Sequence, residues 1–185
     1  MIICVVGQPL SGKDTVAKYL KERKSFNNVS TGDIIREEMR KNKISLDRDN
    51  MQLFAEKSRK QYGNQYPANI AIERIINNGA NKIVVSGPRN MAEINAFREK
   101  FGNRFVLVAI DASIEIRYER AKSRGREGDD ISFEQFKEEE NLERAGNSGS
   151  HELDDVLKSA DYVILNDASE EELFGKIDSL LKSIS

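Results

Sequence analysis

The chain has 185 residues, of which 38% are hydrophobic and 7% aromatic, so it is long enough for one domain with a mostly aliphatic core. Its 29 Lys and Arg residues nearly balance its 31 Asp and Glu residues, which argues against a basic nucleic-acid coat and against a disordered acidic chain. With one cysteine and one histidine, the chain can form neither an internal disulfide nor a Cys/His zinc site.

No apolar segment is long enough to span a membrane. The longest uninterrupted apolar runs are residues 1–6 and 105–110, far short of the roughly 20 residues that cross a bilayer. The first run also lacks the basic flank of a signal peptide. We therefore expect a cytoplasmic protein, a monomer or homodimer, that binds neither membrane nor nucleic acid.

Apolar runs and helical patterns alternate along the chain, which predicts an α/β protein with a mainly parallel sheet. The predicted strands are residues 2–6, 28–30, 83–85, 105–110 and 162–165. One helix is predicted between Pro67 and Gly79 and another between Met91 and Gly102. Two more are predicted to start at capping boxes, formed by Ser132 with Gln135 and by Ser169 with Glu172. The polar stretch 125–150 is expected to be a mobile flap outside the core.

The most specific pattern is a glycine-rich loop between the first predicted strand and a helix. It consists of Gly7, Gln8, Pro9, Leu10, Ser11, Gly12, Lys13, Asp14 and Thr15, here called the P-loop. Phosphate binding needs inward main-chain N–H groups, glycines that allow close approach and a positive helix end. Lys13 is expected to reach the β- and γ-phosphates of a nucleotide. The alternative is an ordinary glycine turn with a lysine at the helix start.

The Gly-Lys-x-Thr spacing, with Asp14 between Lys13 and Thr15, resembles adenylate kinases and related nucleoside monophosphate kinases. Residues 29–36 look like the Ser-Thr-Gly-Asp…Arg segment of these kinases, and residues 86–89 resemble their Asp-Gly-Phe-Pro-Arg segment shortened by one residue. The chain is most similar to the archaeal adenylate-kinase-related proteins. Its C-terminal segment is also similar to dephospho-coenzyme A kinases.

This resemblance implies a three-layer α/β/α P-loop NTPase fold, with a five-stranded parallel sheet of strand order 2-3-1-4-5. Residues 1–185 would form one P-loop kinase domain, with an acceptor-binding subdomain at 31–79 and a short lid at 120–150. The implied cofactors are ATP and Mg²⁺, and the implied substrates are small nucleotides.

The resemblance also assigns roles to residues outside the P-loop. The acceptor phosphate would meet Thr31, Gly32, Arg36 and Arg89, because guanidinium groups fit phosphate oxygens in pairs. Arg120 and Arg124, with Arg126 or Arg144 as further candidates, would swing onto the transferring group, and Asn166 would lie beside the adenine. Each arginine has the alternative of a solvated helix face, and Thr31 that of a helix N-cap.

The metal site departs from the family pattern. Adenylate kinases carry an aspartate where this chain has Ser86, and that carboxylate orders the water shell of the metal. We hypothesise that Asp14 and Thr15 together still offer one carboxylate and one hydroxyl to Mg²⁺ or its waters. The alternative is that Asp14 only favours the first helical turn through the helix dipole.

Asp33 distinguishes two classes of acceptor. A phosphate acceptor is already ionised, whereas a hydroxyl acceptor is helped by a carboxylate within hydrogen-bond reach. We therefore expect an ATP-dependent phosphotransferase of the nucleoside monophosphate kinase type. The alternatives are a hydroxyl kinase, such as a dephospho-coenzyme A kinase with Asp33 as base, and an ATP-binding regulatory protein with little transfer activity. Asp33 also has a structural alternative at a helix start.

Overall fold

In the computed structural model, five strands form one parallel sheet in the order β2-β3-β1-β4-β5. The structure describes residues 1–125, 129–146 and 148–184, with the backbone alone at 48–49, 142–146 and 148–151. The strands are β1 (Ile2–Val6), β2 (Asn27–Ser30), β3 (Ile83–Ser86), β4 (Phe105–Asp111) and β5 (Tyr162–Leu165). The predicted strands and their order are confirmed, with ends shifted by at most one residue.

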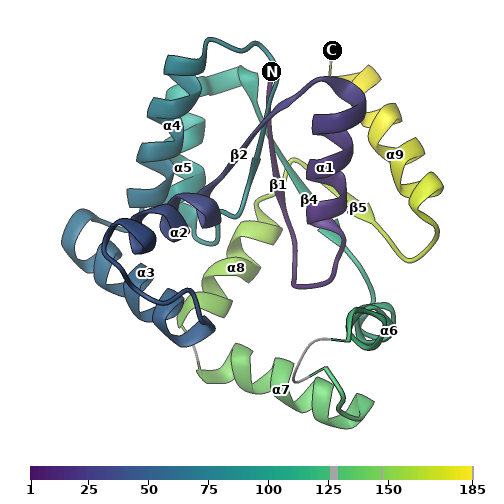
Figure 1. The fold of residues 1–185 in the computed structure, drawn as a ribbon. Helices are drawn as coiled ribbons and strands as arrows, with labels where there is room; N and C mark the ends of the chain where they lie inside the picture. Colours follow the sequence, from purple (N-terminus) through teal and green to yellow (C-terminus); the bar gives the residue numbers. More distant parts are fainter. Residues whose placement is uncertain (126–128, 147, 185) are drawn as a thin grey trace.

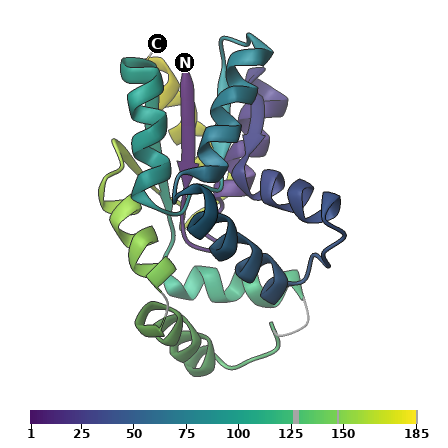
Figure 2. The ribbon, with the colours of Figure 1, turned by 90° about the vertical axis from the view of Figure 1, so that its left-hand side faces the viewer.

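Helices cover both faces of the sheet (Figures 1 and 2). Those with side chains in the two cores are α1 (Lys13–Lys24), α2 (Thr31–Lys41), α4 (Tyr66–Asn78), α5 (Met91–Phe101), α8 (Ser148–Lys158) and α9 (Glu170–Ser183). One core joins the sheet to α4, α5 and α8, and the other joins it to α1 and α9. The predicted three-layer α/β/α fold is therefore confirmed.

The side-chain alternation of β1 explains the two cores. All five of its residues are buried. Ile2, Cys4 and Val6 belong to the core with α4 and α5, whereas Ile3 and Val5 belong to the core with α1 and α9. A central parallel strand has no solvent face, so its sequence is a continuous apolar run.

Side chains cap the helices largely as the sequence indicated. Ser169 accepts a hydrogen bond from the main-chain N–H of Glu172 and starts α9. In the second capping box, Ser132 and Gln135 exchange two hydrogen bonds. The cap of α2 is a correction: its N-cap is Ser30, which accepts from the N–H of Asp33, so Thr31 is the first helical residue.

The remaining helices are α3 (Arg48–Tyr62), α6 (Ile114–Arg124), α7 (Phe133–Gly146) and the short 3₁₀ helix η1 (Gly102–Arg104). The sequence did not predict α8, which contacts both α5 and α7 and places Val156 in the core. Residues 148–150, at the end of the stretch predicted as a flap, thus begin a helix whose later residue Val156 lies in the core. Along one face of α3, Met51 and Phe54 are half-buried and Ser58 is buried, whereas Tyr62 at the end of the helix is 54% exposed.

Among the described residues, no helix combines the length and the hydrophobicity that a membrane crossing would need.

Candidate nucleotide and acceptor site

The P-loop wraps around the start of α1. Leu10 and Gly12 adopt left-handed backbone conformations, with φ of 65° and 98°, and the N–H of Ser11 donates to the Gln8 carbonyl at 3.2 Å. Gly12 is the N-cap of α1 and provides no side chain to bind the first N–H groups of the helix. A Cβ on Gly7 would lie 2.5 Å from the carbonyl oxygen of Ile110. The loop thus needs its glycines and leaves main-chain donors for an anion.

Two residues from the far half of the chain hold this loop in place. The Asn166 amide donates to the Ser11 carbonyl at 2.8 Å. The Arg120 guanidinium donates to the carbonyls of Leu10 at 3.1 Å, of Ser11 at 3.3 Å and of Asn166 at 2.8 Å. Both residues that we expected to bind the nucleotide therefore contact the P-loop. In this structure, Arg120 faces the backbone of the loop.

The Lys13 side chain is largely buried beside the loop. Its ammonium group lies 3.7 Å from the Asp14 carboxylate, which is 85% exposed. Burial lowers the pKa of Lys13, the charge of Asp14 opposes this shift, and the charge of Arg89 adds to it. The charge of Arg89, two residues before α5, therefore acts on the same ammonium group as that of Asp14.

The predicted acceptor residues gather where β3 ends. The hydroxyl of Thr31 donates to the Ser86 carbonyl at 3.4 Å. Gly87 has a φ of 98°, and a Cβ there would lie 2.7 Å from that hydroxyl and 3.1 Å from the main-chain nitrogen of Gly32. The start of α2 is therefore packed tightly against the segment that leads to Arg89.

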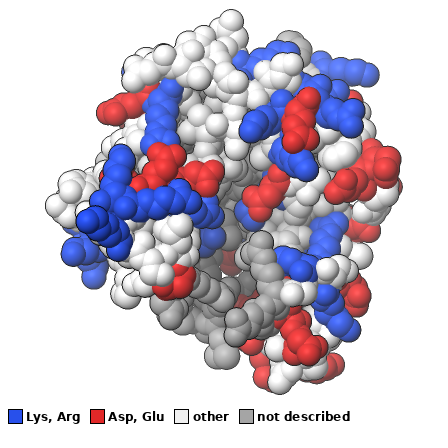
Figure 3. Space-filling model, in the orientation of Figure 1, with Lys and Arg blue, Asp and Glu red and all other residues white. Residues whose placement is uncertain are grey.

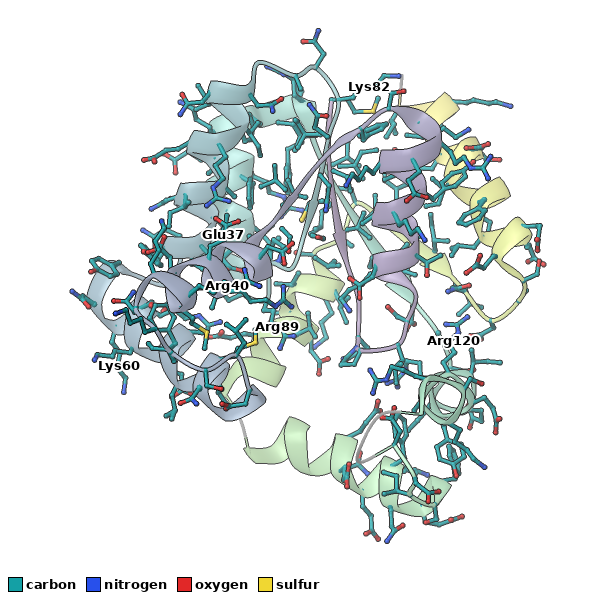
Figure 4. All side chains as sticks on the ribbon, viewed as in Figure 1. Glu37, Arg40, Lys60, Lys82, Arg89 and Arg120 are labelled. Carbon is teal, nitrogen blue, oxygen red and sulfur yellow. The ribbon has the colours of Figure 1, made fainter. Side chains whose placement is uncertain are left out.

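Two carboxylates of α2 pair with arginines, one on α2 itself and one on α4. Arg36 donates to Asp33 at 2.5 Å, and Glu37 accepts two hydrogen bonds from Arg74 of α4 at 2.6 and 3.2 Å. Basic side chains gather over the α2–α3 side of the molecule, next to a hollow that separates it from α1 (Figure 3). Arg89 lies on this α2–α3 side, and Arg120 lies near α6 (Figure 4).

Helix α7, in the stretch predicted as a lid, is tied to α6. Arg117 is 4% exposed, forms two hydrogen bonds to Glu140 of α7 and donates to the Ala112 carbonyl at 3.1 Å. Arg124 makes a bidentate ion pair with Asp129 at 2.6 and 2.9 Å. Arg124 would therefore have to leave Asp129 before it could reach a transferring group. Arg126 and the Arg144 side chain lie outside the described parts of the structure.

The residues of the P-loop fit a nucleotide-bound magnesium ion only in part. Among the described residues, no three His, Cys, Asp or Glu side chains gather as a metal site. Mg²⁺ bound to a nucleotide needs few protein ligands, because phosphates and waters supply the rest. Asp14 lies in the first turn of α1, and Ser86 is buried at the end of β3. Asp14 and Ser86 could therefore hold a magnesium ion only together with the phosphates of ATP and waters, which is the partial fit stated above.

Three charged residues near this site were not predicted from the sequence. Asp154 of α8 accepts a hydrogen bond from the Gln8 amide at 3.3 Å, which brings a carboxylate next to the P-loop. Glu93 lies in the first turn of α5, and the charge of Arg59 of α3 acts on it. Glu93 had a signal in the sequence, since Asn90 followed by Glu93 has the spacing of a helix cap, and the Asn90 side chain does accept from the N–H of Glu93 at 2.9 Å.

Glu93 gives a prediction on stability. It is 2% exposed and accepts the main-chain N–H of Arg89 at 2.7 Å. Burial raises its pKa to about 7 from 4.5, against the opposing charges of Arg59 and Arg89. The folded state holds a proton that the unfolded state releases between these values. The stabilisation from protonated Glu93 is thus complete below about pH 4.5 and is lost as the pH rises through 7.

We expect Glu93→Gln to remove this pH dependence. From pH 5 to pH 8, the free energy of unfolding of the wild type should fall relative to that of the variant by about 2–3 kcal/mol. Urea unfolding at both pH values measures the difference, and Glu99→Gln, at an exposed position of the same helix, is the control. An equal difference at both pH values would contradict the role of Glu93.

Known proteins support the fold and the loop. The family model described as AAA domain covers residues 6–137. The UPF0200 protein of Thermococcus onnurineus is 33% identical over 187 residues, which is 100% of this chain and 98% of the relative. The chain belongs to the UPF0200 family. Its membership agrees with the resemblance to an archaeal P-loop family that the motifs indicated.

Solved structures show the same fold as this UPF0200 chain. TT1252 from Thermus thermophilus has a TM-score of 0.61 at 19% identity and covers 100% of this chain and 98% of its own. The shikimate kinase from Aquifex aeolicus has a TM-score of 0.54 at 19% identity and covers 99% of this chain and 97% of its own. At such identities the likeness shows the P-loop kinase-like fold alone.

Proposed function

We propose that the protein is an ATP- and Mg²⁺-dependent phosphotransferase of the nucleoside monophosphate kinase type, acting on a small nucleotide-like acceptor. One observation carries this proposal: Gly12 begins α1 in a left-handed conformation with no side-chain cap, which leaves main-chain N–H groups beside Lys13 for the phosphates of a nucleotide. We assign Lys13 to the phosphates of the donor and Arg89, whose charge acts on Lys13, to the phosphate of the acceptor. Phosphoryl transfer depends mainly on such positioning and charge neutralisation.

Each group has a task in this reaction. The P-loop amides and Lys13 hold the β- and γ-phosphates, and Arg36 and Arg89 hold the acceptor phosphate beside Thr31 and Gly32. The bond between the γ-phosphorus and the β,γ-bridging oxygen breaks, a bond to an acceptor oxygen forms, and ADP leaves. Bound Mg²⁺ would neutralise charge on the phosphates, with Asp14, Thr15 and Ser86 as the residues that hold it or its waters.

The same proposal assigns the surrounding parts. Residues 1–185 act as one kinase domain, in which residues 31–79 bind the acceptor and residues 120–150 form the lid. Arg120 braces the P-loop through two of its carbonyls and also binds the carbonyl of Asn166, whose side chain would hold the loop beside the adenine. Arg124 would reach the γ-phosphate when its ion pair with Asp129 opens.

A hydroxyl acceptor is the second candidate, because a carboxylate stands at the start of α2. Asp33 is held 2.5 Å from the Arg36 guanidinium, and its side chain is 59% exposed. As a base it would take the proton of the acceptor hydroxyl while the γ-phosphoryl group moves to that oxygen. This arrangement would suit a dephospho-coenzyme A kinase or another alcohol kinase. If no acceptor is phosphorylated, a regulatory ATP-binding role is the third candidate.

One assay separates these candidates. ATP and Mg²⁺ are incubated with nucleoside monophosphates, nucleosides, shikimate and dephospho-coenzyme A, and ADP formation is measured. The blank is Lys13→Ala, and the matched control is Lys18→Ala, at an exposed position of the same helix. Transfer to a nucleoside monophosphate that requires Lys13 supports the first candidate. Transfer only to hydroxyl acceptors, with a large loss in Asp33→Asn, supports the second and contradicts the first.

A further inference from the structure

A cavity of about 320 Å³ lies between α2, α3 and the start of α4. Figure 1 shows α2 and α3 at the end of the molecule away from α9. Of the described residues, those that we assign to the phosphates of the donor and the acceptor are absent from its lining. Small-molecule sites in proteins have volumes from about 300 Å³ upwards. The cavity is therefore large enough for a small ligand of its own.

Two stacked tyrosines form one wall of this cavity. The ring centroids of Tyr62 and Tyr66 lie 4.7 Å apart, the ring planes differ by 23°, and both residues line the cavity. Tyr66 is half-buried, whereas Tyr62 is 54% exposed. The Tyr62 ring thus offers accessible aromatic surface at the end of a stack. Heteroaromatic rings of many kinds stack favourably on such a side chain.

A buried hydroxyl without a partner also lines the cavity. Ser58 of α3 is 5% exposed, and within the described parts of the chain its hydroxyl forms no hydrogen bond. Ser179 of α9, by contrast, donates to the carbonyl four residues before it at 2.9 Å. Among the described residues, the unpaired side-chain atoms that are sealed from solvent belong to Ser11 and Arg59, and the Ser58 hydroxyl is not one of them. Since buried hydroxyls are normally paired, this accessible one points to a ligand.

Acceptor oxygens surround the cavity as well. The side-chain N–H of Asn42 donates to the Glu38 carbonyl at 2.8 Å, and that of Asn50 donates to the Asp47 carboxylate at 2.7 Å. These bonds fix both amide groups and leave their side-chain carbonyl oxygens to accept hydrogen bonds. Asn42, Asn50 and Glu38 all line the cavity. A ligand with N–H or O–H groups would find acceptors there.

The charges around the cavity do not favour a phosphate ligand. Its lining contains one carboxylate, Glu38, which pairs with Lys41 at 2.7 Å, and one ammonium group, Lys57. Among the described residues, no arginine lines it. The cavity also lies beside the C-terminal half of α2, the end of a helix that disfavours anions. A ligand without phosphate groups fits these surroundings better than a nucleotide does.

We propose that this cavity is a second ligand site, which binds a neutral, planar heteroaromatic molecule about the size of a nucleoside. The ring of the ligand stacks on Tyr62, and its polar edge meets the Ser58 hydroxyl and the side-chain oxygens of Asn42 and Asn50. The inference goes beyond the proposed function, because neither the P-loop nor the residues for the acceptor phosphate take part.

Titration with adenosine, guanosine, cytidine and uridine tests the inference. The full chain carries Lys13→Ala, so that no phosphoryl transfer interferes, and binding is followed by calorimetry. We expect at least one nucleoside to bind saturably, and Tyr62→Ala to weaken that binding about tenfold, because a stacking contact is lost. Tyr62→Phe keeps the ring and should bind like the parent protein. The matched control is Tyr162→Ala, which removes a 40% exposed tyrosine from β5.

Ser58→Ala separates binding from folding. Because the hydroxyl has no partner within the described protein, its removal should leave the unfolding temperature unchanged, while nucleoside binding weakens about threefold or more. The inference is wrong if no nucleoside binds saturably, or if Tyr62→Ala binds as tightly as Tyr162→Ala. It is also wrong if AMP displaces the nucleoside and binds more tightly, since the cavity would then belong to the acceptor site.

The proposed function is tested separately, by titration of the protein with intact Lys13 with ATP and Mg²⁺. Absence of ATP binding there contradicts the proposed function and leaves the nucleoside titrations to decide on the cavity.

Discussion

Lys13→Ala is expected to reduce phosphoryl transfer by about a hundredfold or more, because it removes a charge placed where negative charge gathers in the transition state. The ammonium group of Lys13 is largely buried, so water in the variant would neutralise the phosphate charge less well than the lysine does. The charge of Arg89 acts on the same ammonium group. ATP affinity should also fall, by about tenfold or more, since hydrogen bonds to charged groups are stronger than neutral ones.

The binding part of this prediction needs no knowledge of the acceptor. Calorimetric titration with ATP and Mg²⁺ compares the wild type, Lys13→Ala and Lys18→Ala. Lys18 lies exposed on the same helix, so its variant carries the same change in net charge. Equal ATP affinities in all three proteins would show that the P-loop does not hold the nucleotide.

The three inner strands could be predicted from the sequence because they are buried on both faces and form short apolar runs. The edge strands β2 and β5 are more exposed and had weaker signals. The P-loop fixed the direction from β1 into α1. The strand order came from the family resemblance, since apolar runs do not say which strands are neighbours. The sheet confirms it through the register that pairs Ile2 with both Ile83 and Phe105.

The helix that the sequence analysis missed has a short local signal. Residues 148–158 open with two serines around a glycine and contain several charges, which hid the apolar stripe of Leu153, Val156 and Leu157, although Val156 is fully buried. Its place in the core depends on contacts with α5 that lie far away in the sequence. Sequence patterns reflect residues that are close along the chain, so they do not reveal contacts between distant segments such as α5 and α8.

The residues of the candidate site also fall into two groups, those that the sequence motifs predicted and those that only the fold reveals. The P-loop residues and Arg89 could be selected from motifs, because the chemistry of phosphate binding requires those residue types at that spacing. Arg59 and Asp154 could not, because each is one charged residue on a helix with many others. Only the fold shows that Asp154 meets Gln8 and that the charge of Arg59 acts on Glu93.

Gly12→Ala is expected to have the second large effect, on both stability and nucleotide binding. Gly12 has a φ of 98°, which an alanine adopts only under strain, and a Cβ would overlap the Nδ2 atom of Asn166. Asn166 would then lose its 2.8 Å hydrogen bond to the Ser11 carbonyl and with it a brace of the loop. Strain and lost contacts together should cost about 2–4 kcal/mol of unfolding free energy.

A second glycine separates strain from collision. Gly79 also has a left-handed backbone, with a φ of 68°, but no atom lies within 4 Å of a Cβ built there. Gly79→Ala should therefore cost only the strain, about 1–2 kcal/mol, and leave ATP affinity unchanged. Denaturant unfolding and ATP titration compare the two variants. If both lose the same stability and Gly12→Ala still binds ATP like the wild type, then the contact between Gly12 and Asn166 does not shape the P-loop. Nucleotide binding would in that case depend on other parts of the chain.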